Sequence, residues 1–169
     1  MKRIVCFGDS NTFGHNPLDG SRLPRDQRWT GILSDLLGEE YEIIEEGLCG
    51  RTTVRECPES PWVSGLPYLT PCVLSHQPFD LLILMLGTND LQVPFQAIPL
   101  TVARGAEALV HQFLSLDWPP ENRPKLLLVS PIHIGDVSVN PVFGPLFGYE
   151  RASNYSRELA PYYKEIADR

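Results

Sequence analysis

The sequence predicts an α/β protein in which a parallel β-sheet lies between two layers of helices, a three-layer sandwich. The first observation behind this prediction is a set of short apolar runs without polar alternation, as in strands that are buried on both faces. The second is that segments with the apolar spacing of helices separate these runs. The third is that two of the runs end in polar turns, where parallel sheets usually carry their ligand sites.

Four segments are predicted as strands. Residues 4–7 form the first apolar run, and residues 80–86 form another. Residues 41–46 mix apolar and acidic side chains, which indicates a less buried strand at the edge of the sheet. The leucine-rich segment 125–130 is the last predicted strand, and its carboxyl end brings His133 to the rim that the other turns share.

Helices are predicted between and after these strands. Residues 28–37 carry apolar side chains at helical spacing and are followed by Gly38, a common helix stop. The other predicted helices are residues 68–76, 100–114 and 151–169, the last with a break at Pro161. Residues 135–149 are expected to form a loop, whose apolar side chains suit a lid or a contact between chains.

Composition limits the class of protein. A chain of 169 residues, of which 43% are hydrophobic and 21% charged, is expected to form one domain over residues 1–169. A net charge of −7 argues against a nucleic-acid partner or an anionic membrane surface. No apolar stretch is long enough to span a membrane, and a strand follows directly after the first three residues, so a cytoplasmic location is expected. The four cysteines lack metal or redox spacing and are expected to be reduced.

Two polar turns carry the functional prediction. Gly8-Asp9-Ser10-Asn11 follows the first strand, and Gly87-Thr88-Asn89-Asp90 follows the third. Either sequence alone is explained by a turn and a helix N-cap, because these side chains accept hydrogen bonds from free N–H groups. A hydroxyl at the carboxyl end of a parallel strand is also well placed for chemistry, and the presence of two such turns favours this second interpretation.

Together with residues 47–53, the two turns resemble the first three sequence blocks of the SGNH (GDSL-type) serine hydrolases. The blocks occur in the order of that family, and each follows a predicted strand. The wider pattern, which includes Arg28-Trp29-Thr30-Gly31, is most similar to the bacterial arylesterase and acyltransferase branch. The resemblance implies a flavodoxin-like strand order, 2-1-3-4-5, and implies neither a cofactor nor a metal ion.

The resemblance also implies roles for individual residues. Ser10 is expected to be the nucleophile, which requires a base to accept its proton. The oxyanion of the tetrahedral intermediate is expected to bind the backbone N–H groups of Ser10 and Gly50 and the side-chain amide of Asn89. Simpler interpretations exist for two of these residues, since Gly50 suits a plain turn and Asn89 suits an Asx-turn.

Three further residues, Asp9, Arg51 and His133, are candidates for substrate binding. Arg51 adjoins Gly50 and is placed to contact an acyl or leaving group, but a structural salt bridge explains it equally well. Asp9 is also explained as an organiser of its own turn. His133 is expected to contact substrate rather than to act as the base, and His15 either lines the pocket or lies exposed in its loop.

One block of the family has no counterpart in this chain. The SGNH base and its orienting carboxylate come from an Asp-x-x-His pair after a fifth strand, but here no His follows His133, and the only Asp beyond Asp136 is Asp168. Three explanations are open: the domain is C-terminally incomplete, the protein is catalytically disabled, or another histidine acts as the base. We favour an incomplete domain without its last strand and helix. The fourth strand is then an unpaired edge, which favours self-association into homo-oligomers.

Two functions follow as hypotheses. The first is a serine esterase that cleaves small acyl esters through an acyl-enzyme on Ser10, with water or another acceptor taking the acyl group. The second is an SGNH-fold binding protein that keeps the pocket without the chemistry. A flavodoxin-like nucleotide or receiver module is disfavoured, because no glycine-rich phosphate loop follows the first strand.

Overall fold

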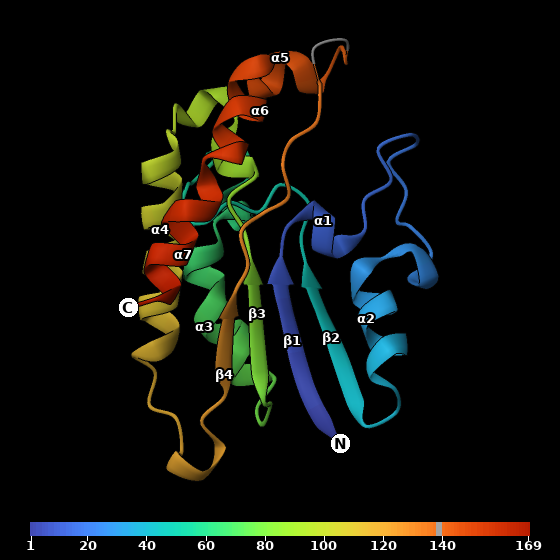
Figure 1. Cartoon of the computed structure of the whole chain (residues 1–169), viewed down its shortest axis with the longest axis vertical. Coiled ribbons are helices and arrows are strands. Elements are labelled where there is room, and N and C mark those ends of the chain that lie inside the picture. Colours follow the sequence, from blue (N-terminus) through green and yellow to red (C-terminus); the bar gives the residue numbers. More distant parts are fainter. Residues whose placement is uncertain (138–139) are drawn as a thin grey trace.

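A parallel sheet of four strands runs through the centre of the structure, a computed structural model that describes residues 1–137 and 140–169. The strands are β1 (Lys2–Gly8), β2 (Tyr41–Gly47), β3 (Leu81–Met85) and β4 (Lys125–Leu128). Their order is β2-β1-β3-β4, which agrees with the order that the sequence predicted for these four (Figure 1). β2 and β4 are the edge strands, so the expected edge position of residues 41–46 is confirmed.

Seven α-helices connect the strands or follow them within the described residues. They are α1 (Ser10–Phe13), α2 (Trp29–Leu37), α3 (Gly65–Ser75), α4 (Pro99–Leu114), α5 (Phe143–Phe147), α6 (Glu150–Arg157) and α7 (Leu159–Ala167). None of those described has both the length and the apolar character needed to cross a membrane.

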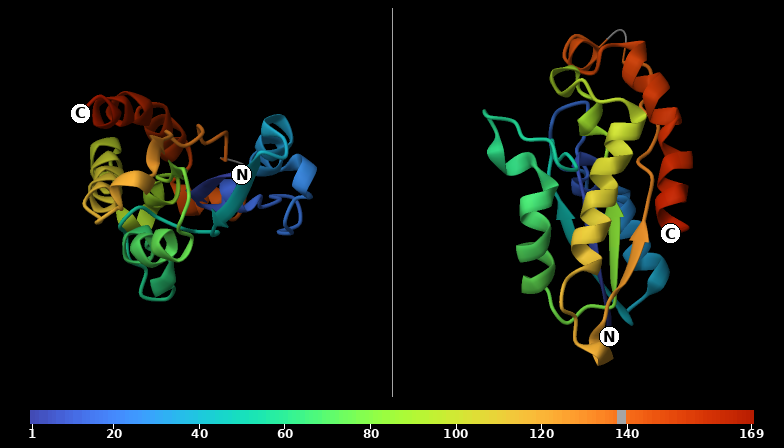
Figure 2. Two further views of the ribbon diagram at one scale, coloured as in Figure 1. Left: turned by 90° about the horizontal axis from the view of Figure 1, so that it is seen from below. Right: turned by 90° about the vertical axis from the view of Figure 1, so that its left-hand side faces the viewer.

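The two faces of β1 pack against different helices, which gives the three layers. Val5 and Phe7 belong to a large apolar core with side chains of α3, α4 and α7. Ile4 and Cys6 point to the opposite face, where side chains of α2 cover them. Figure 2 shows α3, α4 and α7 on one side of the sheet and α2 on the other. The predicted three-layer α/β sandwich is confirmed.

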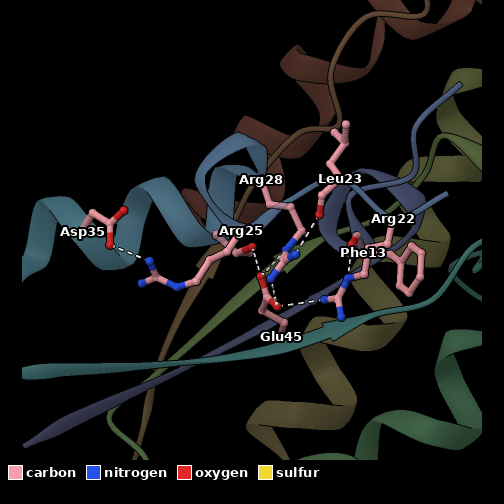
Figure 3. A network of polar contacts seen from close by, with 8 residues as sticks. Phe13, Arg22, Leu23, Arg25, Arg28, Asp35 and Glu45 are labelled. Carbon is pink, nitrogen blue, oxygen red and sulfur yellow. Dashed lines mark hydrogen bonds and ion pairs between the residues drawn. The ribbon is translucent and has the colours of Figure 1, made fainter. Parts of the chain in front are cut away.

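A polar network fastens β2 to the α2 layer (Figure 3). Glu45 accepts hydrogen bonds from Arg28 Nε at 2.9 Å and Nη2 at 3.0 Å, and from Arg22 Nη2 at 2.8 Å. Thr30 Oγ1 donates to the same carboxylate. These bonds hold the connection between α1 and α2, together with the first turn of α2, against the sheet, because they join Arg22, Arg28 and Thr30 to one strand residue.

The larger differences from the sequence prediction concern three helical segments. The helix expected at residues 68–76 begins earlier, at Gly65. The C-terminal helical segment breaks at Glu158 rather than at Pro161, since Pro161 lies in the first turn of α7, where its missing N–H costs no helical bond. The segment 135–149, expected as a loop, contains α5; its residues 138–139 lie outside the described residues.

Candidate active site

A cavity of about 580 Å³ lies where the strands end and is lined in part by residues of α5. We call it the carboxyl-end cavity. Its polar lining includes Ser10, Asn11, Gly50, Thr88, Asn89 and Gln92, from the turns after β1, β2 and β3. Its apolar lining includes Ile132, Ile134, Val137, Phe143, Leu146 and Phe147, from the segment that follows β4. A mostly apolar hollow of this size with a few convergent polar groups is typical of a small-ligand site.

Ser10 is fixed at the start of α1, a single helical turn. Asp9 caps this turn: its Oδ1 accepts hydrogen bonds from the backbone N–H of Asn11 at 2.9 Å and from the Asn11 side chain at 3.0 Å. Gly14 ends the turn with a φ of +83°. The two interpretations of this turn are therefore compatible. Asp9 is an N-cap, and the turn that it caps begins with Ser10, which lines the cavity.

Gly50 and Ser10 present unused backbone donors. Gly50 has a φ of +82°, a conformation that other L-residues rarely adopt, so the turn requires glycine there. In the part of the chain that the structure describes, the backbone N–H groups of Ser10 and Gly50 donate to no protein acceptor. Both residues line the carboxyl-end cavity, so both N–H groups are available to a ligand.

Asn89 is oriented by two hydrogen bonds. Its Nδ2 donates to the backbone carbonyl of Arg51 at 3.0 Å, and its Oδ1 accepts from Gln92 Nε2 at 3.0 Å. A carboxamide nitrogen carries two hydrogens, so one N–H remains after the bond to Arg51. Asn89 is only 6% exposed, which restricts its rotation and keeps the amide fixed at the wall of the cavity.

Asp90 joins the loop after β3 to the loop after β2. Its Oδ2 accepts from the Thr53 N–H at 2.9 Å, and its Oδ1 accepts from Thr53 Oγ1 at 2.5 Å. Burial of this carboxyl raises the pKa of Asp90 from 3.8 to about 6, because desolvation outweighs the two hydrogen bonds. The pair sets the relative position of Gly50 and Asn89, which lie in the two joined loops.

Arg51 lies away from the carboxyl-end cavity, in contrast to its predicted contact with substrate. Its guanidinium lies over the rings of Phe7, at 4.3 Å, and Tyr68, at 5.1 Å. Nη1 donates to the backbone carbonyl of Gly8 at 3.0 Å and to that of Glu46. The alternative interpretation as a salt bridge also differs from the structure, since these acceptors are main-chain carbonyls. Arg51 connects the loop after β2 to the end of β1.

Asp9 is also turned away from the cavity that Ser10 lines. Its side chain is buried and occupied by the N-cap bonds to Asn11, and it is absent from the cavity lining. Burial raises the pKa of Asp9 above its usual value, against the effect of those bonds. The structure thus gives Asp9 the turn-organising position that the sequence offered as its alternative.

Two histidines line the carboxyl-end cavity. His133 follows β4, as the topology predicted, and His15 follows α1. Most of the apolar lining is not indicated by the sequence, although Phe143, Leu146 and Phe147 are among the apolar side chains of the segment 135–149 that suits a lid. No spacing pattern indicates that Gln92 belongs to the site, although its side chain donates to Asn89 Oδ1 from three residues further along the chain.

Comparison with known proteins identifies the family. The sequence pattern of the GDSL-like Lipase/Acylhydrolase family matches residues 6–169. The chain belongs to this family. The match extends beyond the three polar turns into α6 and α7, so it includes the segment that supplies the apolar lining of the cavity.

Solved structures of GDSL-like proteins superpose closely on this chain. The aryl esterase of M. smegmatis is 41% identical with a TM-score of 0.91, over 99% of this chain and 80% of that protein. A carbohydrate acetylesterase from Sinorhizobium meliloti is 39% identical with a TM-score of 0.88, again over 99% and 80%. These similarities confirm the SGNH fold and its arylesterase-like branch.

A curated relative is more distant. A Bacillus subtilis protein named an uncharacterized lipoprotein is 31% identical over 134 residues, which cover 79% of this chain. The matched part spans half the length of that lipoprotein.

Proposed function

We propose that this protein is a serine esterase that cleaves small acyl esters through an acyl-enzyme on Ser10. The observation that carries the proposal is the convergence of Ser10, Gly50 and Asn89 on one cavity. Membership of the GDSL-like family and similarity to an aryl esterase and a carbohydrate acetylesterase support it.

The proposed reaction begins with attack of Ser10 Oγ on the ester carbonyl carbon. The hydroxyl proton passes to a base, and the carbonyl oxygen becomes an oxyanion. The free N–H groups of Ser10 and Gly50 and the remaining N–H of Asn89 are suited to donate to that oxyanion. The C–O bond then breaks, the alcohol leaves with a proton, and water or another acceptor removes the acyl group from Ser10.

The lining of the cavity favours esters with an apolar acyl or aryl group. Ile134, Phe143 and Phe147 line the cavity together with the polar turns. An ester bound with its carbonyl at the polar turns places its apolar group against these side chains. Each buried methylene contributes about 0.8 kcal/mol to such binding.

The test is pre-steady-state hydrolysis of p-nitrophenyl acetate, read by p-nitrophenol release and by intact mass. An esterase is expected to release a burst of p-nitrophenol and to gain one acetyl group. Ser10→Ala abolishes both, whereas Ser60→Ala, at a partly exposed serine outside the cavity, leaves both unchanged. A burst that survives Ser10→Ala refutes the assignment of the nucleophile.

Asn89→Ala tests the oxyanion site separately. Loss of one donor aimed at the developing charge is expected to lower kcat by about 10²–10³-fold with little change in KM. A change confined to KM would contradict the proposed role, because it would show that Asn89 binds the ground state and the transition state equally well.

A second candidate function is ligand binding without catalysis. Its supporting observation is that, among residues 1–137 and 140–169, no imidazole is hydrogen-bonded to the Ser10 hydroxyl. This candidate predicts stoichiometric binding of p-nitrophenyl acetate or acetate with no acetyl group on the protein. His15→Ala and His133→Ala distinguish the two candidates further, since a histidine that serves as base is required for the burst.

A further inference from the structure

A cluster of three metal-ligand side chains lies outside the carboxyl-end cavity. Glu46 lies near the end of β2, Cys72 lies in α3, and His76 is the C-cap residue of α3. One ligand atom from each residue lies within 4.8 Å of the other two. None of the three residues lines the carboxyl-end cavity.

We propose that Glu46, Cys72 and His76 form a binding site for a zinc ion. A thiolate, an imidazole and a carboxylate are the three ligand types that zinc accepts, and a mixed sulfur, nitrogen and oxygen set favours zinc over magnesium or calcium. Three protein ligands leave the fourth tetrahedral position to water. Zinc binding releases the thiol proton of Cys72 to solvent, since the thiolate is the ligand.

The local secondary structure supports a site at this place. Cys72 and His76 are four residues apart, so they lie on one face of α3 across a single helical turn. Paired ligands at this spacing on a helix, completed by a ligand from another element, recur in zinc proteins. Glu46 supplies that third ligand, and its Oε1 already lies 2.7 Å from His76 Nε2.

The required movement is small. Tetrahedral zinc holds nitrogen and oxygen ligands about 3.4 Å apart, so Glu46 Oε1 and His76 Nε2, now 2.7 Å apart, must separate by about 0.7 Å. The Cys72 sulfur lies within 4.8 Å of both atoms, so it must approach by at most about 1 Å. The side chains of His76 and Glu46 are 26% and 19% exposed, which gives both room to rotate and gives an ion a path from solvent. Cys72 is buried beneath them.

Neighbouring groups orient two of the proposed ligands. Tyr68 Oη donates to Glu46 Oε2 at 3.3 Å, which leaves Oε1 directed at the cluster. Arg3 Nη1 donates to the backbone carbonyl of His76 at 2.8 Å and holds the end of α3 in place. Outer hydrogen bonds of this kind fix the direction of metal ligands. The guanidinium groups of Arg3 and Arg51 lie nearby, and the Glu46 carboxylate and the Cys72 thiolate together match the two positive charges of the ion.

Cobalt(II) is the probe, because a cobalt–thiolate bond gives a charge-transfer absorption band in the near ultraviolet. The wild-type protein, kept in a non-thiol reductant, is expected to develop this band up to one equivalent of cobalt. Excess zinc is expected to remove it. Absence of the band in the wild-type protein overturns the proposal.

Substitutions of the proposed ligands test whether the ion binds at this cluster. Cys72→Ser is expected to abolish the band, and His76→Gln to weaken cobalt binding at least about tenfold. Cys49→Ser and Cys57→Ser are matched controls, since Cys49 lines the carboxyl-end cavity with two histidines and Cys57 lies 3.2 Å from Glu59. A band that survives Cys72→Ser, or that is lost in either control, overturns the proposal.

His76→Gln also covers the case in which Cys72→Ser fails to fold, because His76 is partly exposed at a helix end. Unchanged cobalt affinity in His76→Gln then decides against the site. The test is independent of esterase activity, so its outcome and that of the Ser10 experiment are separable.

Discussion

Asp90 gives the protein a predictable dependence of stability on pH. Its pKa is 3.8 in a free chain and about 6 in the folded protein, because the carboxyl is buried. The folded state therefore holds the proton more tightly than the unfolded state. The contribution of the neutral carboxyl to stability is fully present below pH 3.8, falls as the pH rises, and is lost above the folded pKa of about 6. This difference in pKa corresponds to about 3 kcal/mol, at about 1.4 kcal/mol for each pH unit.

Asp90→Asn removes that dependence. The amide cannot ionise, its oxygen still accepts from the Thr53 N–H, and its nitrogen is able to donate to Thr53 Oγ1. We therefore expect the free energy of unfolding of the variant, relative to wild type, to rise by about 2 kcal/mol between about pH 4 and pH 7, out of about 3 kcal/mol over the whole titration. Any loss of hydrogen-bond quality adds a constant that does not vary with pH.

The assay is urea unfolding followed by far-ultraviolet circular dichroism at a series of pH values. Asp26→Asn removes an exposed carboxylate as the control and is expected to stay within about 0.5 kcal/mol of wild type throughout. A difference between Asp90→Asn and wild type that is the same at every pH refutes the assignment of a raised pKa to Asp90.

Two further substitutions test the packing around the site. Tyr163→Phe removes the hydrogen bond, 2.6 Å long, that Tyr163 Oη donates to the buried carbonyl of Leu86. We expect the variant to lower the free energy of unfolding, measured in urea, by about 1–3 kcal/mol, and a change below about 0.5 kcal/mol contradicts this. Gly105→Ala places a methyl group against Thr53 Oγ1 and is expected to destabilise by about 1–3 kcal/mol, despite the better helix propensity of alanine. Gly135→Ala, which meets nothing within 4 Å, is its control, and equal thermal midpoints for the two variants exclude the predicted overlap.

The sheet and the polar turns at its edge were predictable from the sequence, because both depend on local patterns of residues. Apolar runs fix buried strands, and the residues that follow them necessarily lie at one edge of a parallel sheet. The resemblance placed Ser10, Gly50 and Asn89 together, and these three do line one cavity. Their catalytic roles stay predictions, as do the single domain, the cytoplasmic location and the self-association of β4.

Contacts between distant segments were not predictable from the sequence, because no local pattern links residues that lie far apart in the chain. Arg51 was considered for substrate contact, yet it binds main-chain carbonyls and aromatic rings, a role that no pattern near Arg51 indicates. Gly105 lies inside an amphipathic helix, where glycine is unfavourable, and the structure shows that it leaves space for Thr53, whose hydroxyl donates to Asp90. Cysteine spacing likewise gave no hint of Glu46 beside Cys72, since 26 positions separate them.

The two walls of the carboxyl-end cavity come from separate stretches of chain. Most of the polar lining belongs to turns that follow β1, β2 and β3, while most of the apolar lining belongs to the stretch after β4. The polar and the apolar lining are therefore carried mostly by separate parts of the sequence. If the proposed esterase function holds, exchanging the apolar residues of the later stretch between homologues is expected to change which esters fit, while Ser10, Gly50 and Asn89 keep their positions.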